Sequence, residues 1–179
     1  MVRIVSVKST LSEAEAIRQF CGGGIQRWLR PWRRRLVGVR VVYVPYRLFR
    51  ISITNRGQTR TSWWAMDAVM GWLDPYQFDA PWDELPTEWV ETEHVLPAQL
   101  SDEQMRPMML ERVRRWVYRE GFFRLRDLRI EVEPIGREVH IPYWVGVYQR
   151  GVRFSIEVVD GVRKQRQGAK VRDLILKRP

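Results

Sequence analysis

Three short sequence patterns occur twice in this chain, and they occur in the same order each time. The first is a leucine and a serine followed by acidic or amide residues, the second is an apolar residue followed by Pro-Tyr, and the third is an Asp after an apolar run. The spacings between the two copies are 89, 97 and 93 residues, so they differ only by short insertions. An internal repeat fixes the topology of a chain, and this one predicts two copies of a single small unit. The paired patterns are Leu11–Glu15 with Leu100–Gln104, Val44–Tyr46 with Ile141–Tyr143, and Asp67 with Asp160.

Each copy opens on a serine, Ser12 or Ser101, with Glu15 or Gln104 three residues later. This spacing is a capping box, in which the serine oxygen accepts from a helical N–H and the longer side chain reaches back to the cap. The hydrophobic period then shortens to that of strands. The sequence therefore predicts an α+β fold of two tandem α-β-β(-β) repeats with antiparallel sheets, related by a pseudo-twofold axis. Chance similarity between short β segments is the alternative.

A capped helix, a small antiparallel sheet and a late strand that ends in Asp-apolar-x-x-Gly resemble the PepSY-like repeat. Residues 66–71, Met-Asp-Ala-Val-Met-Gly, carry the resemblance, and residues 159–162, Val-Asp-Gly-Val, carry it less fully. The resemblance implies the repeat topology and a non-enzymatic module that binds or restrains partners, often outside the cytoplasm. This chain departs from the pattern because its second copy lacks the glycine and no export signal precedes the first.

An acidic segment in the middle of the chain lies between the two predicted repeats. Residues 61–105 contain ten Asp and Glu and no Lys or Arg, and four prolines interrupt residues 73–99. The predicted boundaries are 1–73 for the first repeat, 74–99 for an acidic connector and 100–179 for the second repeat. A flexible linker needs no aromatic side chains. We therefore expect the connector to be ordered and to dock on a partner or on its own chain through Trp82, Asp83, Glu84 and Trp89.

The whole chain is strongly basic, with 31 Lys and Arg against 21 Asp and Glu and a net charge of +10. This balance favours an anionic partner. Arginine, which dominates, binds phosphate and carboxylate groups in a bidentate manner. The alternative interpretation is a solvated basic helix face beside core tryptophans. The predicted residues for binding an anionic partner are Arg27, Arg30, Trp32, Arg33, Arg34, Arg35, Arg112, Arg115 and Arg119.

Three classes of anionic partner fit these residues. A protein partner, or a second copy of the chain, would use electrostatic docking. RNA or DNA would place phosphates on the arginines and bases on the tryptophans. An anionic membrane surface would use the same residue types at headgroup depth. The sequence predicts a binding or scaffold protein with a protein partner, and it keeps nucleic acid and membrane as alternatives.

No catalytic motif is visible, so the sequence predicts a protein that is not an enzyme, with no cofactor and no small-molecule substrate. Asp67 and Asp160 as paired carboxylates are the enzymatic alternative, although an Asp at a strand end more often caps a turn. One cysteine, Cys21, and two histidines are too few for a His/Cys zinc site. The absence of a signal-like start and of a long apolar run favours a cytoplasmic protein, with peripheral attachment to a membrane left open.

Overall fold

The structure is a computed structural model, and it describes residues 1–22, 34–78, 80–121 and 127–176. Within these residues the chain forms helices and strands whose order follows the sequence. They are β1 (Val2–Val7), α1 (Glu13–Cys21), β2 (Arg35–Asn55), β3 (Gln58–Asp67), β4 (Tyr76–Phe78), the 3-10 helix η2 (Trp82–Glu84), β5 (Thr87–Thr92), α2 (Asp102–Gly121), β6 (Arg129–Arg150), β7 (Arg153–Asp160) and α3 (Ala169–Leu176).

The strands belong to one seven-stranded sheet with the order β4-β3-β2-β6-β1-β5, in which β7 also pairs with β6. The β2–β3, β6–β7 and β1–β5 pairs are antiparallel, and β1 pairs with β6 in parallel. The predicted α+β class is confirmed. The chain divides into two compact units, each built from separate segments. Unit 1 comprises residues 1–44, 87–96 and 140–179, and unit 2 comprises residues 45–86 and 97–139.

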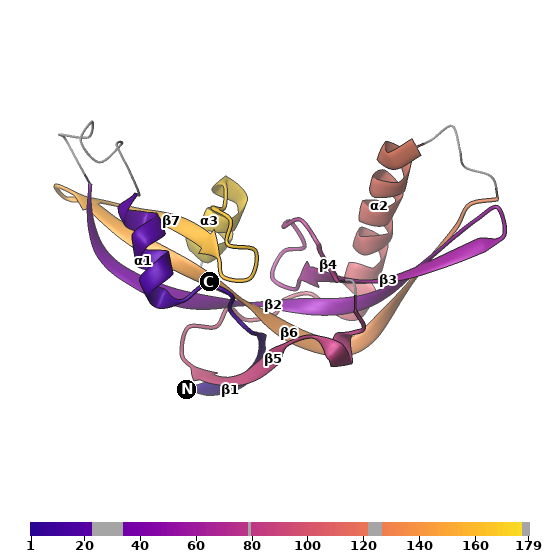
Figure 1. The fold of residues 1–179 in the computed structure, drawn as a ribbon, viewed down its shortest axis with the longest axis horizontal. Helices are drawn as coiled ribbons and strands as arrows, with labels where there is room; N and C mark the ends of the chain where they lie inside the picture. The colour runs from indigo at the N-terminus through magenta and orange to yellow at the C-terminus, as the bar shows by residue number, and fades with distance from the viewer. Residues whose placement is uncertain (23–33, 79, 122–126, 177–179) are drawn as a thin grey trace. The chain divides into compact units, whose positions relative to one another are not determined.

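In unit 1 the short helix α1 packs against the β6–β7 hairpin (Figure 1). Ser12 caps this helix with a complete capping box, because its side chain accepts from the Glu15 N–H and the Glu15 side chain accepts from the Ser12 N–H. These hydrogen bonds lower the pKa of Glu15, first of all the one from the Ser12 backbone. A buried cluster joins the helix to the hairpin through Leu11, Ala16, Phe20, Tyr148 and Val159.

In unit 2 the longer helix α2 packs in the same manner against the β2–β3 hairpin (Figure 1). Ser101 and Gln104 make the corresponding reciprocal bonds at its start. The helix runs through Pro107, which lies inside it. The buried cluster between α2 and the sheet comprises Phe49, Ile51, Trp64, Met66, Ala68, Met105, Met109, Val113, Val117 and Val132.

The turn after each hairpin is held by one buried aspartate. Asp67 faces Tyr46 across its hairpin, and Asp160 faces Tyr143 in the same register. The Oδ1 atom of Asp67 accepts from the N–H groups of residues 70 and 71, and its Oδ2 atom accepts from that of residue 73. The Oδ1 atom of Asp160 accepts from the N–H groups of residues 162 and 163.

The segment that leads into each helix is tied to the same turn. The Ala68 N–H donates to the Pro45 carbonyl at 2.8 Å, and the Gly161 N–H donates to the Pro142 carbonyl at 2.8 Å. The carbonyl of Ala68 accepts from residues 99 and 100, and that of Gly161 accepts from residues 10 and 11. The hairpin that follows one predicted helix is therefore covered by the other predicted helix, and the same hydrogen bonds recur in both units.

Candidate docking surface

The charge of the chain is divided unequally between the two units. Unit 1 contains 18 Lys and Arg against 8 Asp and Glu, whereas unit 2 contains 13 of each. The net charge of +10 therefore comes entirely from the segments of unit 1. A net charge of one sign attracts oppositely charged molecules and speeds their association.

Exposed apolar side chains follow the same division. Among the described residues, ten large hydrophobic side chains are exposed, and only Trp72 and Tyr118 belong to unit 2. Scattered single residues of this kind are normal on a protein surface. Their concentration on the charged unit means that both charge and apolar area are available there. The eight in unit 1 are Met1, Val2, Ile17, Val37, Trp89, Val152, Phe154 and Leu176.

Several arginines of unit 2 pair with acidic groups of the same unit. Arg47 of β2 lies 3.9 Å from an oxygen of Asp102 and 3.4 Å from one of Glu138. Arg50 pairs with Glu133 through two of its nitrogens. These pairs connect β2 to α2 and β6 within the unit. Exposed pairs of this kind add little free energy each, but they neutralise the surface of unit 2.

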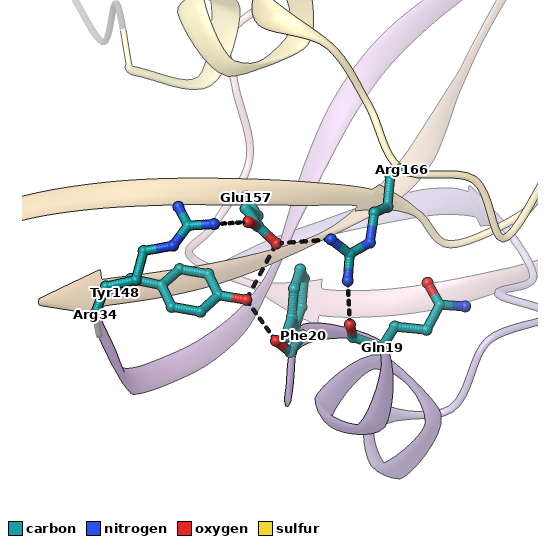
Figure 2. Close-up of polar contacts among 6 residues, drawn as sticks. All are labelled: Gln19, Phe20, Arg34, Tyr148, Glu157 and Arg166. Carbon is teal, nitrogen blue, oxygen red and sulfur yellow. Dashed lines mark hydrogen bonds and ion pairs between the residues drawn. The ribbon is translucent and has the colours of Figure 1, made fainter. Parts of the chain in front are cut away.

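Unit 1 has one polar cluster of its own, centred on Glu157 of β7 (Figure 2). Its carboxylate is 18% exposed and forms ion pairs with Arg34 and, at 3.3 Å, with Arg166. The Tyr148 hydroxyl lies 3.1 Å from the same carboxylate and 2.8 Å from the Phe20 carbonyl. Arg166 also donates to the carbonyl of Gln19. The cluster therefore satisfies two carbonyls of the last turn of α1, where a helix has no partners of its own.

The environment of Tyr148 keeps its hydroxyl protonated. Burial and, next, the negative charge of Glu157 raise the pKa of Tyr148 to about 12. The Arg34 guanidinium lies over the Tyr148 ring, 4.5 Å from its centroid. Arg34 is thus engaged by a carboxylate and an aromatic ring at once. We interpret the cluster as a cap that holds the end of α1.

The predicted arginines lie in different parts of the chain. Arg27, Arg30, Trp32 and Arg33 lie outside the described residues. Arg35 is exposed at the start of β2 in unit 1. Arg112 donates to the carbonyls of Gly71 and Trp72 and lies 3.8 Å from Asp74. Arg115 and Arg119 are exposed on α2, in unit 2.

The residues predicted for the docking segment are also divided between the units. Trp82 belongs to unit 2 and lies under the guanidinium of Arg137 at 5.0 Å. Asp83 and Glu84 are exposed beside it on η2. Trp89 belongs to β5 in unit 1, is 65% exposed and lies under Arg3 at 4.6 Å. Since β5 pairs along its whole length with β1, this part of the segment already has a partner in its own chain.

The other residues considered from the sequence have structural contacts. Both buried aspartates accept backbone N–H groups within their own turns, and they belong to different units. His140 is buried, with its Nδ1 atom 3.2 Å from the Val5 carbonyl. Within the described part of the chain, no three His, Cys, Asp or Glu side chains gather as they would around a metal ion.

The sequence did not lead us to select the tip of the β6–β7 hairpin as a candidate binding site. Val152, which lies between the exposed Arg150 and Arg153, is 92% exposed, and Phe154, which follows Arg153, is 65% exposed. The signal was an apolar residue directly after the turn glycine, Gly151, where polar residues are usual. The unequal division of charge was also missed, because the segments of each unit are not contiguous in the sequence.

Comparison with known proteins gives no further guide to this surface, since no family model, no curated protein and no solved structure matches the chain. Among the described residues, none of the helices has the length and apolar character needed to cross a membrane.

Proposed function

We propose that this protein is a non-enzymatic binding or scaffold protein that docks an anionic partner through unit 1. The observation that carries the proposal is the unequal division of charge: unit 1 holds the whole net charge of +10, and eight of the ten exposed large hydrophobic side chains belong to it. Charge alone would favour transient contacts that salt disrupts. Apolar side chains beside the charge add contact area that salt does not screen.

Unit 2 has the complementary role of a support. It is neutral, and ion pairs within the unit engage Arg47, Arg50 and Arg112. A buried cluster joins α2 to the sheet from Met105 to Val117. A neutral, well-packed unit gives a partner little long-range attraction. The predicted contribution of Arg112, Arg115 and Arg119 to docking is accordingly smaller in this proposal than that of unit 1.

The repeat is also part of the proposal. We infer that the two units derive from two copies of one α-β-β element whose helices are exchanged, so that each helix covers the hairpin of the other copy. The matching register, aspartate turns and capping boxes support this inference. The PepSY-like resemblance applies to this topology. In that arrangement the surface of unit 1 can change while unit 2 preserves the fold.

Neutralisation of matched basic residues in the two units tests the proposal. One variant replaces Arg35, Arg40, Arg153 and Lys170 of unit 1 by Gln, and its control replaces Arg56, Arg60, Arg115 and Arg119 of unit 2 by Gln. All eight side chains are exposed, and each variant loses four positive charges.

Fluorescence anisotropy then measures the binding of labelled polyglutamate and of mixed-sequence single-stranded RNA, at about 50 and about 150 mM salt. We expect the unit 1 variant to bind about tenfold or more weakly than wild type, and the control to stay within about threefold. Equal losses in the two variants would contradict the assignment to unit 1. A wild-type protein that binds neither probe would contradict docking of an acidic protein segment or of a nucleic acid through unit 1.

A further inference from the structure

The tip of the β6–β7 hairpin exposes apolar side chains that its fold does not require. The loop has two residues, Gly151 and Val152, between the paired Arg150 and Arg153. Gly151 has a φ of 59°, which suits glycine at the first central position of a type II′ turn. The second position accepts most residues, and here it is a valine that is 92% exposed. Figure 1 shows the tip at the end of the hairpin, beyond α1 and α3.

The equivalent tip in unit 2 shows what a hairpin of this protein needs. The β2–β3 loop consists of Arg56 and Gly57, with φ values of 53° and 74°, between the paired Asn55 and Gln58. The flanking pair Thr54 and Thr59 shares a hydrogen bond of 2.8 Å between the two hydroxyls. Residues 54–60 contain no apolar side chain. A polar tip is thus sufficient for the turn, so the apolar tip of unit 1 calls for another explanation.

Positive charge surrounds the apolar tip. Arg150 and Arg153 are exposed on either side of the loop, and Phe154 follows with 65% of its surface exposed. The contact of Arg34 with the Tyr148 ring also brings the start of β2, with the exposed Arg35, to this end of unit 1. The tip therefore combines two apolar side chains with two flanking arginines, and Arg35 adds positive charge at the same end of unit 1.

We propose that this tip inserts into the headgroup layer of an anionic lipid bilayer. A bilayer presents negative charge at its surface and apolar chains directly below it, and the tip presents arginines and then Val152 and Phe154 in the matching order. A nucleic acid would offer bases for Phe154 to stack on but nothing for an aliphatic Val152. The inference rests on the proposed function, because the charge of unit 1 supplies the long-range attraction to the surface.

Vesicle co-sedimentation tests the inference. The probes are vesicles of phosphatidylcholine alone and of phosphatidylcholine with about a third phosphatidylserine. We expect the wild type to bind the anionic vesicles and to leave the neutral ones largely in solution. Joint replacement V152S and F154S should weaken binding about 30-fold, since each side chain loses its burial in the apolar layer. Joint replacement R150Q and R153Q should weaken it about tenfold or more.

The polar hairpin of unit 2 supplies the matched control. R56Q and R60Q together remove two positive charges from an equivalent exposed position, and we expect them to change vesicle binding by less than about threefold. All the replaced side chains are exposed, so thermal unfolding of the variants should match that of the wild type.

The outcomes separate the two proposals. Binding of polyglutamate or RNA without binding of anionic vesicles would overturn the lipid inference and leave the proposed function standing. Vesicle binding that V152S and F154S do not weaken would also overturn it, because charge alone would then account for attachment. Failure of every anionic probe would overturn both.

Discussion

The two units make the same backbone hydrogen bonds with different side chains, and the exchange of one aromatic ring shows how. In unit 1 the ring belongs to the helix: Phe20 lies over Gly146 of β6, where an added Cβ would meet the ring at 2.8 Å. In unit 2 the corresponding strand residue is Phe49, three positions after Tyr46, and the helix supplies Met109. The large side chain at this contact can therefore come from the helix or from the strand, provided that the residue facing it is smaller.

A second difference concerns the strand residue three positions before each turn aspartate, which contacts the helix of its unit. Glu157 lies three residues before Asp160, and Trp64 lies three residues before Asp67. Trp64 packs edge-to-face on Trp116 of the 20-residue helix α2, with centroids 5.6 Å apart. Glu157 instead helps to cap the nine-residue helix α1. The unit with the shorter helix thus relies on polar contacts where the other relies on apolar packing.

The largest predicted effect concerns the contacts that the units share. Replacement of either Asp67 or Asp160 by Ala should destabilise the protein by about 3 kcal/mol or more, because buried backbone N–H groups lose a charged acceptor. Urea unfolding followed by circular dichroism measures the change. The two effects should be similar if the turns are equivalent. A loss below about 1 kcal/mol at one of them would break the comparison between the units.

The next largest effect on stability concerns the contact between Gly146 and the Phe20 ring. Gly146→Ala should cost about 1–3 kcal/mol, because the new methyl group meets the Phe20 ring. In a Phe20→Met background, which imitates Met109 of unit 2, the same replacement should cost far less, with a coupling energy of about 1 kcal/mol or more.

Gly38 on β2 is the matched control for this cycle, since an added Cβ there meets nothing within 4 Å. Gly38→Ala should change the free energy of unfolding by less than about 0.5 kcal/mol. Additive effects of Gly146→Ala and Phe20→Met would show that the ring does not set the size of residue 146.

The sequence predicted the fold class and the paired patterns, since both depend on local chemistry. The capping boxes at Ser12 and Ser101 are examples, because four consecutive residues are enough to define each one. The division into units could not be predicted, because it depends on which helix covers which hairpin. Four of the predicted docking residues, Arg27, Arg30, Trp32 and Arg33, lie outside the described residues. Arg34 shows a further reason for error: a positive charge in the sequence does not reveal the carboxylate 123 residues away that engages it.

The pH dependence of stability tests the polar cap that Glu157 and Tyr148 form in unit 1. The pKa of Tyr148 is about 12 in the folded protein and about 10 in an unfolded chain. The folded state therefore retains a proton that the unfolded state loses above pH 10, and stability falls as the pH rises towards 12. At pH 11 the expected loss is on the order of 1 kcal/mol relative to neutral pH.

Comparison with Tyr148→Phe isolates this contribution, because all other titrating groups are common to both proteins. The variant should be less stable at pH 8, since it lacks the bonds to Glu157 and to the Phe20 carbonyl. The difference between the two proteins should shrink as the pH is raised from 9 to 11. Parallel pH profiles would mean that the hydroxyl is not held protonated by the cluster.

The smallest effect concerns the fifth residue of each Asp turn, which is a glycine in the first turn and a lysine in the second. Gly71 has a φ of 68°, and Lys164, at the corresponding position, has a φ of 58°. Each donates its N–H to the carbonyl of the turn aspartate, at 3.1 and 2.9 Å. The backbone thus keeps the left-handed conformation although the glycine is absent. Because a side chain disfavours that conformation, Lys164→Gly should stabilise the protein by about 1 kcal/mol, measured as an increase in the urea midpoint.

The variant Lys164→Asn distinguishes the effect of the left-handed backbone from the effect of the lysine charge on stability. Asparagine removes the positive charge and tolerates the left-handed region better than most residues, so it should stabilise by less than glycine does. Gly71→Ala in unit 2 should act in the opposite direction, because the new methyl group would also meet the Met108 side chain. If Lys164→Gly destabilises the protein, then the lysine contributes a contact that outweighs its strained backbone, and the two turns differ in more than one glycine.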